Sequence, residues 1–219
     1  MIGRPGAVIL DCDGVLVDSE PLMNREFTAM LNALGLSYTT DATIRTFMGR
    51  SMKSCIEIVE GELGRRVPDD FLSVLDARAA AAFAHDLRPV AGIEVLLEAL
   101  DRSGTPYAVA SSGSHDKMRM TLGITGLLPR LEGRITSATE VAHGKPFPDV
   151  FLLAADRLQV APAECVVIED SLLGIAAALA GGMRVIGHAA MVDADEMRRA
   201  GATQVVATMH EVPALLALD

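Results

Sequence analysis

The sequence is poor in basic residues and contains no long apolar run. Its 19 lysines and arginines are outnumbered by 29 acidic residues, which gives a net charge of −10. A nucleic-acid-binding protein needs positive charge to neutralise phosphates and release their counterions. No stretch approaches the roughly 20 apolar residues of a membrane span, and the apolar run at 7–10 is too short for a signal peptide. We therefore expect a cytoplasmic protein with neither nucleic acid nor a membrane as a partner.

Cysteine is also scarce, which argues against two further classes of protein. Cys12, Cys55 and Cys165 are odd in number and lie far apart, without C-x-x-C spacing. The sequence therefore predicts neither a disulfide framework nor a zinc site, and buried free thiols are expected. Half of the 219 residues are hydrophobic, so the chain can form one large domain or a domain with a smaller insert.

Short apolar runs alternate with amphipathic segments over most of the chain. The runs are 7–10, 107–111, 165–169, 184–187 and 204–207. Continuous apolar runs of this kind are typical of strands buried on both faces of a parallel sheet. Helical periodicity recurs between them, at 92–100, 149–158 and 172–182. The alternation predicts an α/β fold with a doubly wound, Rossmann-like parallel sheet.

The segment 20–86 interrupts this alternation, because it reads as consecutive helices without a strand. Ser19 is suited to cap the first helix, Pro21 to its first turn and Gly35 to the position after its end. Further helices are expected near 41–48, 52–63 and 69–84, and the proline and glycine of 86–92 indicate a return linker. The prediction is a core domain formed by 1–19 and 87–219, with a helical domain at 20–86 inserted into it.

Two carboxylates follow the first predicted strand. Asp11 and Asp13 stand directly after the run 7–10, and Gly14 comes next. In an open parallel sheet, ligands bind at the carboxyl ends of the strands. The spacing of two residues directs both side chains to one side while the strand lasts, and glycine then lets the chain turn. An ordinary Asp-Gly turn has the same pattern, so this motif alone does not decide the function.

Three further polar motifs occur at matching places. The motif "ASSG" (110–113) offers a hydroxyl and backbone amides that can hold an anion, "HGKPFPD" (143–149) carries a lysine, and "VVIEDS" (166–171) ends a strand with two acids. The candidate residues are Ser111, Ser112, Gly113, Lys145, Glu169 and Asp170.

The chemistry of these motifs converges on phosphoryl transfer. Carboxylates gathered at one edge repel one another unless a hard cation such as Mg²⁺ lies among them. A serine hydroxyl and a lysine ammonium facing that ion would neutralise the remaining charge on a transferring phosphoryl group. The sequence therefore predicts a Mg²⁺ cofactor and a small phosphorylated metabolite as the ligand.

These motifs, in this order, resemble a known family. The stretches "DCDGVLVDSE", "ASSG", "GKPFPD" and "VIEDS" are similar to the four ordered motifs of the haloacid dehalogenase superfamily. The resemblance is to the subgroup whose helical cap is inserted after the first motif, and it extends from residue 8 to about 188. It implies a Rossmann-like core with a helical-bundle cap.

The resemblance also implies a role for each motif. Asp11 would be the nucleophile that forms an aspartyl-phosphate. Asp13 would act as the general acid for the leaving oxygen and then as the base for water. Ser111, with the amides after it, would bind the phosphoryl oxygens, and Lys145 would bridge the phosphate and the nucleophile.

The metal ligands are implied in the same way. Asp170 would bind Mg²⁺ together with the carboxylate of Asp11 and the backbone carbonyl of Asp13. Glu169 would support or ligate the ion.

Arg50 and Lys53 are candidates for substrate contact from the cap, although both also fit the pattern of solvated basic residues.

The superfamily contains several activities, so membership leaves the reaction open. Dehalogenases lack the second aspartate, and Asp13 argues against that activity. Mutases of the β-phosphoglucomutase type usually carry a histidine on the first cap helix, where this chain has Met23. A non-catalytic binding member would be expected to have lost a charged motif position, and none is lost. We expect a monomeric phosphatase acting on sugar phosphates, sugar-acid phosphates or phosphoglycolate, with a phosphomutase as the alternative.

Overall fold

The computed structural model describes residues 2–47 and 52–218, and the chain divides into two compact units. The core unit comprises 1–18 and 88–219, and the helical unit comprises 19–87. The chain therefore leaves the core unit soon after its first strand and returns to it before all the others.

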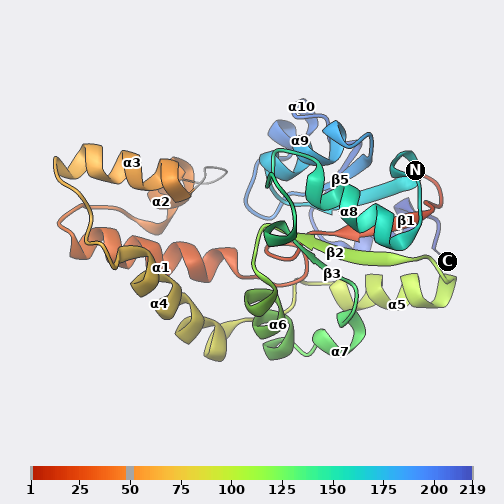
Figure 1. The fold of residues 1–219 in the computed structure, drawn as a ribbon, viewed down its shortest axis with the longest axis horizontal. Helices are drawn as coiled ribbons and strands as arrows, with labels where there is room; N and C mark the ends of the chain where they lie inside the picture. Colours follow the sequence, from red (N-terminus) through yellow and green to blue (C-terminus); the bar gives the residue numbers. More distant parts are fainter. Residues whose placement is uncertain (1, 48–51, 219) are drawn as a thin grey trace. The chain divides into compact units, whose positions relative to one another are not determined.

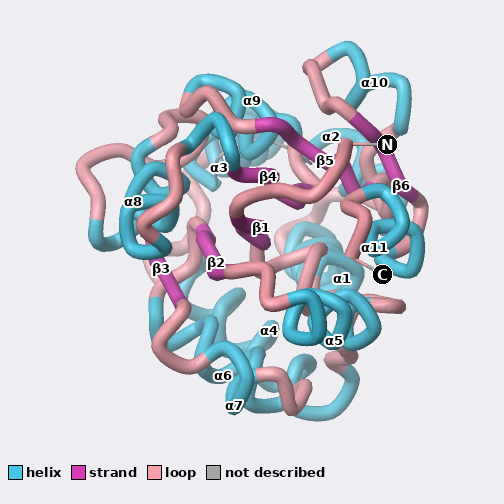
Figure 2. The backbone as a smooth tube through the Cα atoms, turned by 90° about the vertical axis from the view of Figure 1, so that its right-hand side faces the viewer, coloured by secondary structure: helices cyan, strands magenta, loops and turns pink. Residues whose placement is uncertain are grey.

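The core unit contains a parallel sheet (Figure 1), whose six strands follow the order β3-β2-β1-β4-β5-β6 (Figure 2). The strands are β1 (Ala7–Leu10), β2 (Tyr107–Ser111), β3 (Ile135–Ser137), β4 (Cys165–Glu169), β5 (Arg184–His188) and β6 (Gln204–Val206). Every residue of β1, β2 and β4 is buried, which explains their continuous apolar runs. The predicted doubly wound α/β fold is confirmed.

Helices cover both faces of this sheet. They are α5 (Ile93–Ser103), α6 (His115–Ile124), α7 (Leu128–Leu131), α8 (Asp149–Leu158), α9 (Leu172–Ala180), α10 (Ala194–Arg199) and α11 (Val212–Leu215). The short 3-10 turns are η1 (Ala138–Glu140), η2 (Pro162–Glu164) and η3 (Met209–Glu211). Helices α8 and α9 lie on one face and α5 lies on the other (Figure 2). Because the strands are parallel, their carboxyl ends meet at one edge.

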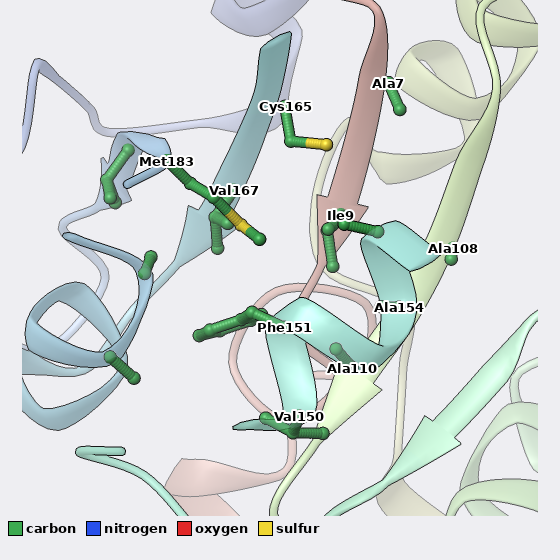
Figure 3. Close-up of a cluster of buried hydrophobic side chains, with 14 of the residues drawn as sticks. Ala7, Ile9, Ala108, Ala110, Val150, Phe151, Ala154, Cys165, Val167 and Met183 are labelled. Atoms are coloured by element: carbon green, nitrogen blue, oxygen red, sulfur yellow. The ribbon is translucent and has the colours of Figure 1, made fainter. Parts of the chain in front are cut away.

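The largest side chain between α8 and the sheet belongs to Phe151. It is fully buried, in a cluster that includes Ile9 on β1 and Val167 on β4 (Figure 3). The Nζ atom of Lys145, in the loop before α8, lies 4.6 Å from the centroid of the Phe151 ring. The core beneath α8 therefore also supports the loop that carries this lysine.

The sequence did not predict β3 and α6. Strand β3 has three residues at the edge of the sheet, too few to form a recognisable apolar run. Helix α6 begins after Ser114, whose side chain accepts a hydrogen bond from the amide of Lys117 (3.2 Å). Both elements matter for the site. Helix α6 follows the motif at 110–113, and β3 supports it through a hydrogen bond from Ser137 to Gly113.

The helical unit consists of α1 (Glu20–Ala33), α2 (Thr40–Phe47), α3 (Met52–Leu63) and α4 (Phe71–Asp86). Its core contains the rings of three buried phenylalanines, and the centroids of Phe27 and Phe47 lie 5.1 Å apart in an edge-on contact. Ser19 occupies the expected N-cap position, but its side chain makes no capping hydrogen bond there. Met23, on α1, packs against this core.

None of the helices in the described part of the chain has both the length and the apolar character that a membrane span requires.

The packing beneath α8 yields a stability prediction. Replacing Phe151 with alanine should lower the free energy of unfolding by about 3 to 5 kcal/mol, because it leaves a cavity in a fully packed core. Urea denaturation measures the change. Phe147→Ala is the matched control, since this nearby side chain is 54% exposed and its loss should change the stability by about 0.5 kcal/mol or less. Equal effects of the two substitutions would contradict the assignment of Phe151 to the core.

Candidate active site

The register of the sheet brings the sequence motifs to one edge. Leu10 of β1 pairs with Ile168 of β4, so Asp11 and the acidic pair that ends with Asp170 leave neighbouring strands at matching positions. Strand β2 lies on the other side of β1 and ends at Ser111. The central strand thus carries a carboxylate between a hydroxyl and two further carboxylates.

Lys145 joins two of these carboxylates. Its Nζ atom donates hydrogen bonds to Oδ1 of Asp11 (2.5 Å) and to Oε1 of Glu169 (2.6 Å). The lysine side chain is only 6% exposed. Burial by itself would lower the pKa of Lys145, but the charges of Asp11 and Glu169 outweigh it and raise the pKa. The ammonium group therefore stays protonated inside the site.

Asp11 has a strongly altered proton affinity. Burial raises its pKa to about 7, the nearby Lys145 opposes the rise, and the charge of Glu169 adds to it. The negative charge at this position is thus only partly balanced by the protein's own cation. A carboxylate in this condition is a good ligand for a further cation.

Asp11, Glu169 and Asp170 could hold that cation. Each offers a carboxylate oxygen, and these oxygens all lie within 4.8 Å of one another. Oε2 of Glu169 accepts hydrogen bonds from the amide (2.7 Å) and the hydroxyl (2.9 Å) of Ser171, which fix the direction of this carboxylate. A set of hard oxygen donors suits Mg²⁺, so these residues fit the predicted cofactor.

Two glycines make room for the acidic cluster. Gly14 has a φ of +72°, and a Cβ atom built on it would lie 2.0 Å from Oδ2 of Asp170. A Cβ atom on Gly174 would lie 1.7 Å from Oε1 of Glu169. The turn at Gly14 was predicted from the sequence, whereas the two close approaches appear only in the folded chain. His188 adds support, because Nδ1 of this buried side chain donates to the Gly14 carbonyl (2.8 Å).

The loop after β2 is ordered by two serine hydroxyl groups, one from the end of β2 and one from β3. Oγ of the buried Ser111 accepts a hydrogen bond from the amide of Gly113 (3.0 Å), and Oγ of Ser137 donates to the Gly113 carbonyl (2.6 Å). Ser112 between them is exposed. A serine oxygen that accepts from an amide still has its own proton to donate to an anion.

Asp13 meets a residue that the sequence analysis missed. Nζ of Lys117, in the first turn of α6, lies 2.8 Å from Oδ2 of Asp13. The two residues are 104 positions apart, and α6 itself was not predicted. A lysine in the helix that follows the serine motif was the only signal in the sequence, and one charge on a helix is too common to identify a site.

The two substrate-contact candidates of the helical unit stay predictions. Lys53 lies on α3 and is exposed. Arg50 falls outside the residues that the structure describes.

Comparison with known proteins identifies a family over most of the chain. The sequence pattern of the haloacid dehalogenase-like hydrolases matches residues 8–188. Among curated relatives, a 6-phosphogluconate phosphatase of Escherichia coli is 29% identical, over 84% of this chain and 82% of its own. Hexitol phosphatase A of the same organism is 32% identical, over 84% and 83%. A phosphoglycolate phosphatase of Xylella fastidiosa is 31% identical, over 82% and 78%.

Solved structures share the whole architecture. A hydrolase of this family from Deinococcus radiodurans, determined with bound phosphate and sodium, has a TM-score of 0.84 and 31% identity, covering 98% of this chain and 96% of its own. A Thermotoga maritima protein whose assignment as a β-phosphoglucomutase is provisional has a TM-score of 0.79 and 28% identity, covering 96% and 98%.

The raised pKa of Asp11 predicts how the metal-free protein responds to pH. Between the ordinary value of 3.8 and about 7, the folded protein keeps a proton on Asp11 that the unfolded chain has released. Stability should therefore fall as the pH rises through this window. In Asp11→Asn this contribution is absent, so the melting temperature of the wild type should drop relative to that of the variant between pH 4 and pH 7, measured with a chelator present. Parallel curves would show that the pKa of Asp11 is not raised.

Proposed function

The chain belongs to the haloacid dehalogenase-like hydrolases, and we propose on that basis that it is a Mg²⁺-dependent phosphatase of small phosphomonoesters that works through an aspartyl-phosphate on Asp11. The observation that carries the proposal is the buried Lys145 between Asp11 and Glu169, with Asp170 beside them. This arrangement holds a nucleophile and a cation together at the edge of the sheet where an anion is expected to bind.

The residues of the core unit supply each step. A carboxylate oxygen of Asp11 attacks the phosphorus atom, and the ester oxygen leaves as Asp13 gives it a proton. Ser111 and the amide groups after it bind the phosphoryl oxygens, while Lys145 keeps the attacking carboxylate oriented. Asp13 then takes a proton from a water molecule, whose oxygen attacks the phosphorus of the aspartyl-phosphate and regenerates Asp11.

The acidic cluster is the proposed Mg²⁺ site. Asp11 and Asp170 would hold the ion with their carboxylates, together with the backbone carbonyl of Asp13, and Glu169 would support it. When bound, Mg²⁺ supplies positive charge that offsets the repulsion between the nucleophile and the phosphoryl oxygens.

The proposed substrates are sugar phosphates, sugar-acid phosphates or phosphoglycolate. The names of three relatives support this class, since they specify a sugar-acid phosphate, hexitol phosphates and phosphoglycolate. Lys53 and Arg50 are the proposed contacts to the part of the substrate beyond the phosphate. We further propose that the enzyme acts as a monomer in the cytoplasm.

A phosphomutase is the second candidate, favoured by the likeness to the Thermotoga protein. A mutase must protect its phosphoenzyme from water and return the phosphoryl group to the sugar. Met23, at the position where such mutases usually carry a histidine, packs against the core of the helical unit and offers neither a charge nor a proton. This supports transfer of the phosphoryl group to water.

The product formed from β-glucose 1-phosphate tests the choice between the two. With Mg²⁺ and a trace of glucose 1,6-bisphosphate, turnover of this sugar phosphate should release inorganic phosphate without accumulating glucose 6-phosphate. A panel of sugar phosphates, sugar-acid phosphates and phosphoglycolate is assayed in parallel, and Asp11→Asn should be inactive on all of them, because an amide cannot form the acyl-phosphate. Rapid formation of glucose 6-phosphate with negligible free phosphate would overturn the phosphatase assignment.

The metal site has a test that does not depend on turnover. Mg²⁺ should raise the melting temperature of the wild type, because it binds the folded protein and relieves the repulsion among Asp11, Glu169 and Asp170. Asp170→Ala should abolish the shift. Asp195→Ala, which removes an exposed acid on α10, is the control and should keep it. A shift retained in Asp170→Ala would place the ion elsewhere.

A further inference from the structure

We propose that Lys117 is a positioning residue for proton transfer, which holds the carboxylate of Asp13 in the direction needed to reach the leaving oxygen. The proposal rests on the proposed function, in which Asp13 acts as the general acid and base. Lys117 lies outside the four sequence motifs and has no role in the proposed reaction steps.

The contact is more shielded from water than an ion pair that Arg119 of the same helix forms with Glu132. The Lys117 and Asp13 side chains are 34% and 21% exposed, and their charged atoms lie 2.8 Å apart. The side chains of Arg119, on α6, and Glu132, after α7, are 52% and 51% exposed, and their charged atoms lie 3.3 Å apart. Water screens the first pair less than the second, so the first is better able to fix a side-chain direction.

Lys117 reaches Asp13 by crossing the loop proposed to bind phosphate. A Cβ atom built on Gly113 would lie 3.5 Å from Cδ of Lys117 and 3.4 Å from Oγ of Ser111. The aliphatic part of the lysine therefore passes beside Gly113, next to the serine hydroxyl. The start of α6 is itself held by Ser114, whose side chain accepts from the Lys117 amide.

The backbone of Asp13 is already fixed by the turn that follows it. The Gly14 amide donates to the carbonyl of Val17 (2.8 Å), and Asp13 forms an isolated bridge with the same residue. These bonds determine where the Cα atom lies. The ion pair with Lys117 selects one direction for the carboxylate, tied to the loop at 111–114. Asp13 is proposed to give a proton to the leaving oxygen and to take one from water, so its carboxyl group must lie within reach of both, and small misplacements cost large factors in rate.

The test compares two aryl phosphates of similar size, p-nitrophenyl phosphate and phenyl phosphate, with the Mg²⁺-loaded enzyme. Phenolate leaves less readily than nitrophenolate and needs the proton more. Lys117→Met should lower kcat/KM for phenyl phosphate about tenfold more than for p-nitrophenyl phosphate, which is part of the 10²- to 10⁴-fold that general acid catalysis supplies. The control Arg119→Met, on the same helix, should leave both values within about twofold of the wild type.

A double substitution separates positioning from other roles. In an Asp13→Asn background, Lys117→Met should cause no further loss of kcat/KM on either substrate, because its effect passes through the carboxylate. Lys117→Arg, which keeps a long cation, should restore most of the discrimination between the substrates and serves as the second variant if Lys117→Met does not fold. Equal losses on both substrates, or a further loss in the Asp13→Asn background, would overturn the proposal.

The same data distinguish failure of this inference from failure of the proposed function. If the wild type releases no phosphate, or if Asp13→Asn lowers both kcat/KM values equally, the proposed function itself fails and the inference fails with it. If Asp13→Asn acts selectively on phenyl phosphate while Lys117→Met behaves like Arg119→Met, only the inference fails.

Discussion

The arrangement on which the site depends is a buried ammonium group between two buried carboxylates. Lys145 bonds both Asp11 and Glu169, and all three side chains are shielded from water. Burying charge is costly unless each ion is paired, so this cluster is stable only while its members stay together. The cluster still carries one negative charge in excess, and Asp170 adds another. Burial, with the charge of Glu169 adding to it, raises the pKa of Asp11, and the acidic groups make the edge of the sheet attractive to a cation.

The sheet topology and two missing side chains make this cluster possible. Strand β1 lies between β2 and β4, so a single carboxylate at its end can face a hydroxyl on one side and an acidic pair on the other. The acids also need space, and Gly14 and Gly174 provide it beside Asp170 and Glu169. An alanine at either position would place its methyl group where a carboxylate oxygen now lies. The site is therefore formed as much by the absence of side chains as by the charged groups themselves.

A second hydrogen-bonded network, at the surface of the core unit, shows how the same chemistry serves structure. Hydrogen bonding from Arg157 lowers the pKa of Glu140 to about 2, and the Ser137 amide and His115 reinforce the effect. Glu140 orients Ser137, whose hydroxyl holds the Gly113 carbonyl in the loop proposed to bind phosphate. Hydrogen-bond donors surround Glu140 and keep it ionised, whereas burial raises the pKa of Asp11 to about 7. The contrast separates a carboxylate that supports the loop from one that can gain or lose charge near neutral pH.

The sequence alone was enough to predict the α/β fold and the position of the helical insertion, because buried parallel strands have a continuous apolar pattern. It was also enough to predict the residues that meet at the strand ends, because the carboxyl ends of parallel strands lie at one edge of the sheet. The tertiary structure decided the rest. Strand β3 is too short to produce a pattern, and the close approaches of Gly14 and Gly174 depend on how loops from different strands pack. The pairing of Lys117 with Asp13 depends on the position of α6 over the loop after β2. Local sequence patterns record which side chains are buried, but not which residues 104 positions apart come within hydrogen-bonding distance.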